Sequence, residues 1–285
     1  MNPSHIIAGT MNWGAGGARL NTQGMATIIQ AAMEAGITTF DHADIYGGYT
    51  TEADFGRGFE ASAVARSSVQ FITKCGIRYP MDHAKHSVKH YDYSEEHIRR
   101  SLENSLAHLK TDYIDVYLLH RPSPLLGPEE AVGVLESLKR EGKILSWGVS
   151  NFTRFQMEMM GKGLEWNQLE CSLTHADPMV NGTLDWHQTH AVRTMAWSPL
   201  GTFFKGESPE RTRLAPVVER LTEKYACSAS NVLLAWLRRH PAQIVPVVGT
   251  TRPERLLDMS ECNRVHLETE DWFALLEASW GHKVP

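Results

Sequence analysis

The amino-acid sequence predicts an α/β fold, a closed (β/α)8 TIM barrel built as one domain over residues 1–285. Short runs rich in Val, Ile and Leu alternate with longer amphipathic stretches, which is typical of parallel strands joined by crossover helices. Eight such runs can be counted, and barrels of this type routinely hold about 250 residues in one domain. Periodicity alone leaves a doubly wound open sheet as the alternative.

The predicted strands are short apolar runs that recur along the whole chain, separated by helical patterns. A parallel sheet is covered on both faces, so its strands are apolar throughout. The eight runs are Ile6 to Thr10, Thr38 to Asp41, Val69 to Thr73, Ile114 to Leu119, Ser146 to Ser150, Trp166 to Cys171, Arg193 to Trp197 and Ile244 to Val248.

Three of the intervening stretches have clear helical signatures. Thr22 to Glu34 and Glu95 to Leu109 place apolar residues at helical spacing, so each predicts a crossover helix. A third helix begins at Pro128, where a proline in the first turn is followed by two acids near the positive end of the helix dipole, and it ends at Gly142.

Two connections, residues 75–94 and 199–209, are too long to be simple turns. Long loops in compact domains are usually functional. Each follows a predicted strand, so each lies at the C-terminal face, where barrel active sites are found. We expect these loops and the C-terminal tail through Trp280 to shape a pocket.

Composition and charge favour a small-molecule partner. Hydrophobic residues make up 42% of the chain and charged residues 21%, close to the average for globular domains. The net charge is −5, without a cluster of basic residues, which argues against nucleic acid or a membrane surface as a partner. No apolar segment approaches the roughly 20 residues of a membrane span. The oligomeric state stays open.

The cysteines and the N-terminus predict a cytoplasmic protein. No two cysteines have metal-ligand or redox spacing, so they are expected to be reduced thiols. The N-terminus has no basic stretch followed by an apolar run, as a secretory signal would. The cysteines are Cys75, Cys171, Cys227 and Cys262.

Four residues suggest a catalytic group. Asp41, Lys74 and His120 stand at or just past predicted strand ends, and Tyr46 follows Asp41 by five positions. In a barrel these ends converge on one mouth. A phenol with a pKa of about 10 is a poor acid, but a neighbouring ammonium lowers that pKa. We therefore expect Lys74 to activate Tyr46 as an acid, Asp41 to keep Lys74 charged, and a neutral His120 to polarise a carbonyl.

Several motifs resemble those of the aldo-keto reductase superfamily over nearly the whole chain. They are Asp-x-Ala-Asp-x-Tyr-Gly at residues 41–47, Thr73-Lys74 and Leu118-Leu119-His120, followed by matching segments at 141–144, 148–152, 198–201 and 245–251. Residues 41–49 and 118–124 are similar to the YdhF-type bacterial branch. The resemblance implies an NADP(H)-dependent reductase of small-molecule aldehydes or ketones. It also implies that Tyr46 is the proton donor.

The resemblance further implies a cofactor site. Ser150, Asn151 and Gln168 would hold the nicotinamide carboxamide, and the ring of Trp197 would stack on the nicotinamide. Arginines near the last strand would bind the 2′-phosphate of NADP, because a guanidinium donates two hydrogen bonds to one phosphate. Trp13 and His120 would contact substrate. The remaining predicted cofactor residues are Ser198, Leu200, Gly249, Thr250, Thr251, Arg252 and Arg255; at Gly249 many members of the superfamily carry a lysine.

Two other functions remain open at this point. A metal-dependent hydrolase would use Asp41, His42, Asp44 and His120 as ligands, because carboxylates and histidines at strand ends bind zinc in some barrels. A cofactor-binding sensor or subunit would keep the fold with little turnover, since a fold does not determine a function.

Overall fold

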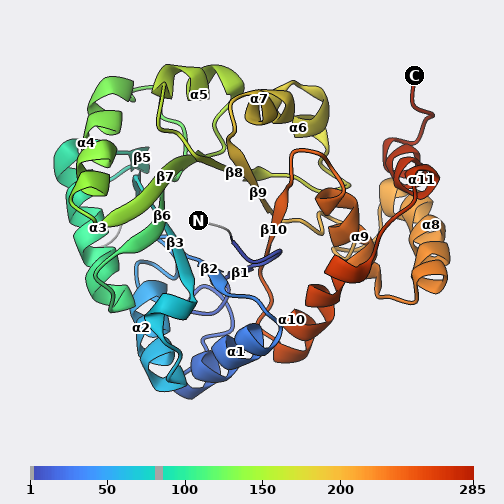
Figure 1. The fold of residues 1–285 in the computed structure, drawn as a ribbon, viewed down its shortest axis with the longest axis horizontal. Helices are drawn as coiled ribbons and strands as arrows, with labels where there is room; N and C mark the ends of the chain where they lie inside the picture. The colour runs from blue at the N-terminus through green and yellow to red at the C-terminus, as the bar shows by residue number, and fades with distance from the viewer. Residues whose placement is uncertain (1–2, 81–85) are drawn as a thin grey trace.

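The computed structural model describes residues 3–80 and 86–285. Eight parallel strands close into a barrel in the order β1-β10-β9-β8-β7-β6-β3-β2 (Figure 1). This confirms the predicted (β/α)8 barrel and excludes the open sheet. The strands are β1 (Ile7–Gly9), β2 (Thr39–Asp41), β3 (Gln70–Cys75), β6 (Ile114–Leu119), β7 (Ile144–Ser150), β8 (Trp166–Glu170), β9 (Arg193–Trp197) and β10 (Val245–Val248).

Helices surround the strands (Figure 1). Ser94 caps the helix over residues 95–109, since its hydroxyl accepts a hydrogen bond from the backbone N–H of His97 at 3.3 Å. Pro128 stands in the first turn of the next helix, as predicted. The helices are α1 (Thr22–Glu34), α2 (Thr51–Ser62), α3 (Glu95–Leu109), α4 (Pro128–Arg140), α5 (Arg154–Met160), α6 (Asp177–Val180), α7 (Thr183–Thr189), α8 (Pro209–Tyr225), α9 (Ala229–Arg238), α10 (Pro253–Ser260) and α11 (Thr269–Trp280).

Apolar side chains fill the barrel interior below the mouth. The interior cluster includes Ile7, Ile72, Val116 and Met195, whereas Phe71 and Cys75 belong to the layer between strands and helices. Side chains alternate along a strand, so Lys74 shares the interior face with Ile72. The alternation therefore places the ammonium of Lys74 above these apolar side chains, at the mouth of the barrel.

The long connection at residues 75–94 contains a small hairpin that the sequence analysis did not predict. Strands β4 (Ile77–Arg78) and β5 (His90–Tyr91) pair antiparallel. Two-residue strands carry too little periodicity to be recognised in a sequence. Residues 81–85 of this loop lie outside the described residues.

The C-terminal tail returns to the mouth side of the barrel. The Ser279 hydroxyl at the end of α11 donates to the backbone oxygen of Leu173, just past β8, at 2.7 Å. Trp280 is partly buried and its ring stacks on that of His282. Among the described helices, none is both long and apolar enough to cross a membrane.

Candidate active site

A buried ion pair occupies the mouth of the barrel. Lys74, at the end of β3, donates to both carboxylate oxygens of Asp41 at 2.8 and 2.9 Å, and to the backbone oxygen of His42 at 2.7 Å. Both side chains are nearly inaccessible, at 1% and 4% exposure. Two charges removed from water in this way must be paired and hydrogen-bonded. Asp41 therefore holds Lys74 in a single position.

Tyr46 and His120 complete the group that the sequence predicts. Lys74 Nζ donates to the phenol oxygen of Tyr46 at 3.2 Å. The rings of Tyr46 and His120 meet edge to face with centroids 6.1 Å apart. Because Lys74 donates to the phenol oxygen, the hydroxyl hydrogen of Tyr46 is left for another acceptor.

The electrostatics of Tyr46 differ from the prediction. Burial raises the pKa of Tyr46; Lys74 lowers it, but the Asp41 carboxylate raises it again, and the net direction is upward. The prediction of a lowered pKa was wrong because burial of the phenol, the largest effect, and the Asp41 carboxylate together outweigh the lowering by Lys74. Tyr46 is therefore a fully protonated phenol near neutral pH.

Lys74 and His120 have the charge states that were expected. Burial alone would lower the pKa of Lys74, but Asp41 and Tyr46 reverse this and the pKa is raised. Burial, Lys74 and Arg121 hold the pKa of His120 well below its ordinary value. Nδ1 of His120 is buried and has no hydrogen-bond partner among the described residues. Of the two ring nitrogens, Nε2 is not among the buried atoms without a partner.

Gln168 connects opposite sides of the barrel. It lies on β8, diametrically opposite β2 in the barrel order, and its side-chain amide donates to Asp41 Oδ1 at 2.8 Å. The sequence analysis assigned Gln168 only to the nicotinamide carboxamide. In the structure its amide nitrogen also restrains the carboxylate that holds Lys74.

The other predicted cofactor residues follow one another along the arc from β7 to β10. Asn151, in the left-handed backbone region at φ 62°, donates from Nδ2 to Ser150 Oγ at 2.9 Å and accepts from the indole of Trp197 at 2.8 Å. These bonds tie the ends of β7 and β9 together. Leu200 packs against two apolar clusters, both separate from the interior cluster of the barrel, and Ser198 is also left-handed, at φ 50°.

The segment after β10 is the most exposed part of this arc. Thr250 Oγ1 accepts from the backbone N–H of Arg252 at 3.2 Å, while Gly249 and Thr251 adjoin it. Arg252 and Arg255 are exposed at the start of α10, and neither forms an ion pair within the described part of the chain.

Trp13 does not face the mouth. Its indole is fully buried, packs against Phe40 and Phe55 with centroids 6.3 and 6.1 Å away, and donates to the backbone oxygen of Thr250 at 2.9 Å. The prediction of Trp13 as a pocket wall is corrected: its ring is core packing that ties the loop after β1 to the loop after β10.

A model of the aldo/keto reductase family matches residues 5–279. The chain belongs to this family. A 6-dehydroglucose reductase of Agrobacterium fabrum is 41% identical over 90% of this chain and 88% of its own length. Oxidoreductase YdhF of Escherichia coli is 35% identical over 96% of this chain and 92% of its own, in agreement with the predicted YdhF-type branch.

The fold is also that of known aldo-keto reductase structures. An aldo/keto reductase from Klebsiella pneumoniae, solved in complex with NADP and acetate, superposes with a TM-score of 0.80 at 24% identity, covering 98% of this chain and 92% of that chain.

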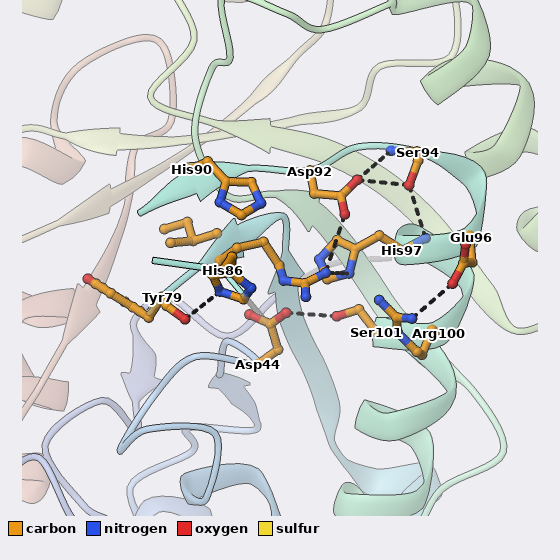
Figure 2. Close-up of polar contacts among 12 residues, drawn as sticks. Asp44, Tyr79, His86, His90, Asp92, Ser94, Glu96, His97, Arg100 and Ser101 are labelled. Carbon is orange, nitrogen blue, oxygen red and sulfur yellow. Dashed lines mark hydrogen bonds and ion pairs between the residues drawn. The ribbon is translucent and has the colours of Figure 1, made fainter. Parts of the chain in front are cut away.

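The ligand set of the alternative metal hydrolase does not converge in this aldo-keto reductase. His42 points into the aromatic core, with Thr10 Oγ1 2.9 Å from Nδ1 and the ring of Phe55 at 4.3 Å. Asp44 turns toward α3 and accepts from Ser101 at 2.7 Å (Figure 2). Within residues 3–80 and 86–285, no three His, Cys, Asp or Glu side chains form a metal-binding group.

Asp44 belongs to a crevice between α2 and α3, on the outer side of β3, that is lined by several ionisable residues. Its volume is about 100 Å³, and Glu52, His97 and His108 also line it. Glu52 accepts from Thr73 at 2.5 Å and from Ser105 at 3.0 Å. Burial raises the pKa of Asp44 and that of Glu52, each to about 7. The crevice is thus separated from the mouth by the strand that carries Lys74.

Proposed function

We propose that this protein is an NADPH-dependent reductase that converts an aldehyde or ketone carbonyl of a small molecule to an alcohol. The observation that carries the proposal is the buried Lys74, which contacts Asp41 and Tyr46 at once. A phenol hydrogen-bonded by a fixed ammonium, beside a neutral imidazole, is suited to protonating an oxygen as charge develops on it.

Each residue has a separate task in this proposal. Tyr46 donates its proton to the carbonyl oxygen as the carbon is reduced. The phenolate left behind accepts a hydrogen bond from Lys74, and this stabilisation offsets the high pKa that burial gives the phenol. Neutral His120 donates from Nε2 to the same oxygen and sets the orientation of the carbonyl. Asp41 and Gln168 hold Lys74 in place.

The residues from β7 to β10 fit a nicotinamide dinucleotide. Ser150, Asn151 and Gln168 supply the hydroxyl and amide groups that a carboxamide needs, and Trp197 supplies an aromatic face. NADPH, when bound, supplies the hydride. Arg252 and Arg255, next to Thr250 and Thr251, form no ion pair with any residue that the structure describes. They favour NADP(H) over NAD(H), because a charge-assisted hydrogen bond to the 2′-phosphate is stronger than a neutral one.

The cysteines and the charge of the chain bear on where the protein acts and on what it binds. The four cysteines are free thiols, which is consistent with the cytoplasmic location we propose, and residues 1–285 would act as one domain. The proposed partner is a small carbonyl compound rather than nucleic acid or a membrane.

The test is Tyr46→Phe, which removes the proton donor and keeps the ring. We expect nearly all turnover with a panel of aldehydes and ketones to be lost, while NADPH affinity, measured by fluorescence titration, stays unchanged. Activity within tenfold of wild type would refute the role of Tyr46. A wild-type protein that binds NADPH but reduces no carbonyl would favour the sensor or subunit instead.

A further inference from the structure

Arg121 is the first residue past His120, and its backbone is held rigidly. The Tyr93 hydroxyl donates to the backbone oxygen of Arg121 at 2.5 Å and accepts from its N–H at 3.0 Å. Pro122 follows and restricts Arg121 to extended conformations. Because neighbouring Cα atoms are about 3.8 Å apart, Arg121 is fixed at the same mouth as the catalytic histidine.

The guanidinium of Arg121 is directed over the site. Its Cζ lies 5.7 Å from the centre of the Trp197 ring, across the mouth from β6 to the end of β9. The positive charge is close enough to lower the pKa of both Tyr46 and His120, alongside the larger effects of burial and Lys74. The guanidinium therefore lies over one face of the Trp197 indole, at the same mouth as Tyr46 and His120.

This charge has no acceptor in the described part of the chain. Arg121 is partly buried, yet no carboxylate in residues 3–80 or 86–285 lies within ion-pair distance of it, and its guanidinium makes no hydrogen bond there. A guanidinium withdrawn from water favours a carboxylate or phosphate partner. The second positive charge nearby, the ammonium of Lys74, is already neutralised by Asp41.

Lys89 adds to the positive character of the mouth. It stands just before β5 and is exposed, and its Nζ lies 5.0 Å from the centre of the Tyr79 ring. Its positive charge contributes to the lowered pKa of His120. Figure 2 shows Asp92, Ser94 and His97 where the hairpin leads into α3: Asp92 accepts from the Ser94 backbone N–H, and the Ser94 hydroxyl accepts from that of His97. Since the whole protein carries a net charge of −5, attraction of an anion depends on such local cations.

We propose that Arg121 binds the substrate, and that the preferred substrate is an aldehyde or ketone bearing an anionic oxygen group, a carboxylate or a phosphate, a few bonds from its carbonyl carbon. This rests on the proposed reductase function. The carbonyl oxygen accepts hydrogen bonds from Tyr46 and His120. The anionic group accepts two hydrogen bonds from the guanidinium of Arg121, the next residue along the chain. Lys89 guides the anion toward the mouth without a fixed contact.

The experiment compares pairs of substrates in which one member carries an anionic group and the other does not. Succinic semialdehyde is paired with its methyl ester, and glyceraldehyde 3-phosphate with glyceraldehyde, so the two arms separate carboxylate from phosphate. Wild type, Arg121→Met and Arg121→Lys are assayed with NADPH. Arg193→Met is the matched control, because Arg193 also lies over a tryptophan ring, Trp166 at 5.0 Å, but at the start of β9, the opposite end of the barrel.

We expect wild type to favour the anion of at least one pair. Arg121→Met should lower kcat/KM for that anion by about ten- to a hundredfold, the size of a lost charge-assisted hydrogen bond, and for its neutral partner by less than about threefold. Arg121→Lys should keep part of the preference for the anionic substrate, and Arg193→Met should keep all of it. Added salt should weaken the preference in wild type.

Four results would overturn the inference. Equal losses with charged and neutral substrates would mean that Arg121 acts only through Tyr46 and His120. A matching loss of NADPH affinity without substrate would assign Arg121 to the cofactor. Wild-type reduction of both members of each pair at equal rates would refute the anionic substrate while leaving the reductase function intact; reduction of none would refute both.

Discussion

The two acids in the crevice between α2 and α3 make the stability of the fold depend on pH. Asp44 and Glu52 are 8% and 2% exposed, and burial raises the pKa of each to about 7 from ordinary values of 3.8 and 4.5. Between the unfolded and folded values the native state binds more protons than the unfolded chain. The free energy of unfolding therefore falls as the pH rises toward 7, and the loss is complete above it.

The magnitude follows from the same values. For each acid, the free energy of unfolding falls by about 1.4 kcal/mol for every pH unit between its unfolded and its folded pKa. Between pH 6 and pH 8 the two acids together therefore remove about 3 kcal/mol of stability. The double variant Asp44→Asn, Glu52→Gln keeps the shape of both side chains and cannot ionise. Relative to wild type it should gain about 3 kcal/mol from pH 6 to pH 8.

Urea unfolding followed by circular dichroism at half-unit pH steps would measure this difference. Comparing the two proteins at the same pH cancels the contribution of every other titrating group. The single variants should each account for about half of the gain. A difference between wild type and double variant that does not change with pH would show that neither carboxyl group has a pKa near 7, and the argument from burial would fail.

Three further predictions concern the mouth. Lys74→Met should abolish turnover and lower the free energy of unfolding by about 3–5 kcal/mol; adding Asp41→Asn should restore stability in urea unfolding without restoring activity, and recovered activity would contradict the role of Lys74. His120→Ala should lower kcat/KM by roughly 100- to 1000-fold with NADPH affinity unchanged, and a loss larger than that of Tyr46→Phe would make His120 the acid. Arg255→Ala should weaken NADPH binding by about ten- to a hundredfold but not NADH binding in parallel titrations, and equal effects on both would remove Arg255 from the phosphate site.

The barrel could be predicted because its strands are buried on both faces and stand out as apolar runs. The helices α1 and α3 follow the predicted ranges, since their apolar spacing and caps are local signals. The catalytic group could be placed because residues at the ends of parallel strands must meet. The hairpin of β4 and β5 is too short to leave such a pattern.

Features that depend on distant partners could not be predicted. Trp13 was assigned to the pocket because it follows a strand, but its ring packs on Phe40 and Phe55, which only the closed barrel brings to it. The pKa of Tyr46 depends first on burial of the phenol and then on Lys74 and Asp41, which only the folded chain brings together. The sequence does give one indication of Arg121, its position directly after His120. That no acid among the described residues pairs with it is visible only in three dimensions.

The bond from Gln168 to Asp41 makes the two halves of the mouth interdependent. A substitution made on β8 to change cofactor preference would also release the carboxylate that holds Lys74, and so alter proton transfer. Redesign of cofactor use is therefore safer at Arg252 and Arg255, whose exposed side chains at the start of α10 have no bond to the catalytic group. Laboratory evolution for a new cofactor should accumulate changes there first and leave Gln168 untouched.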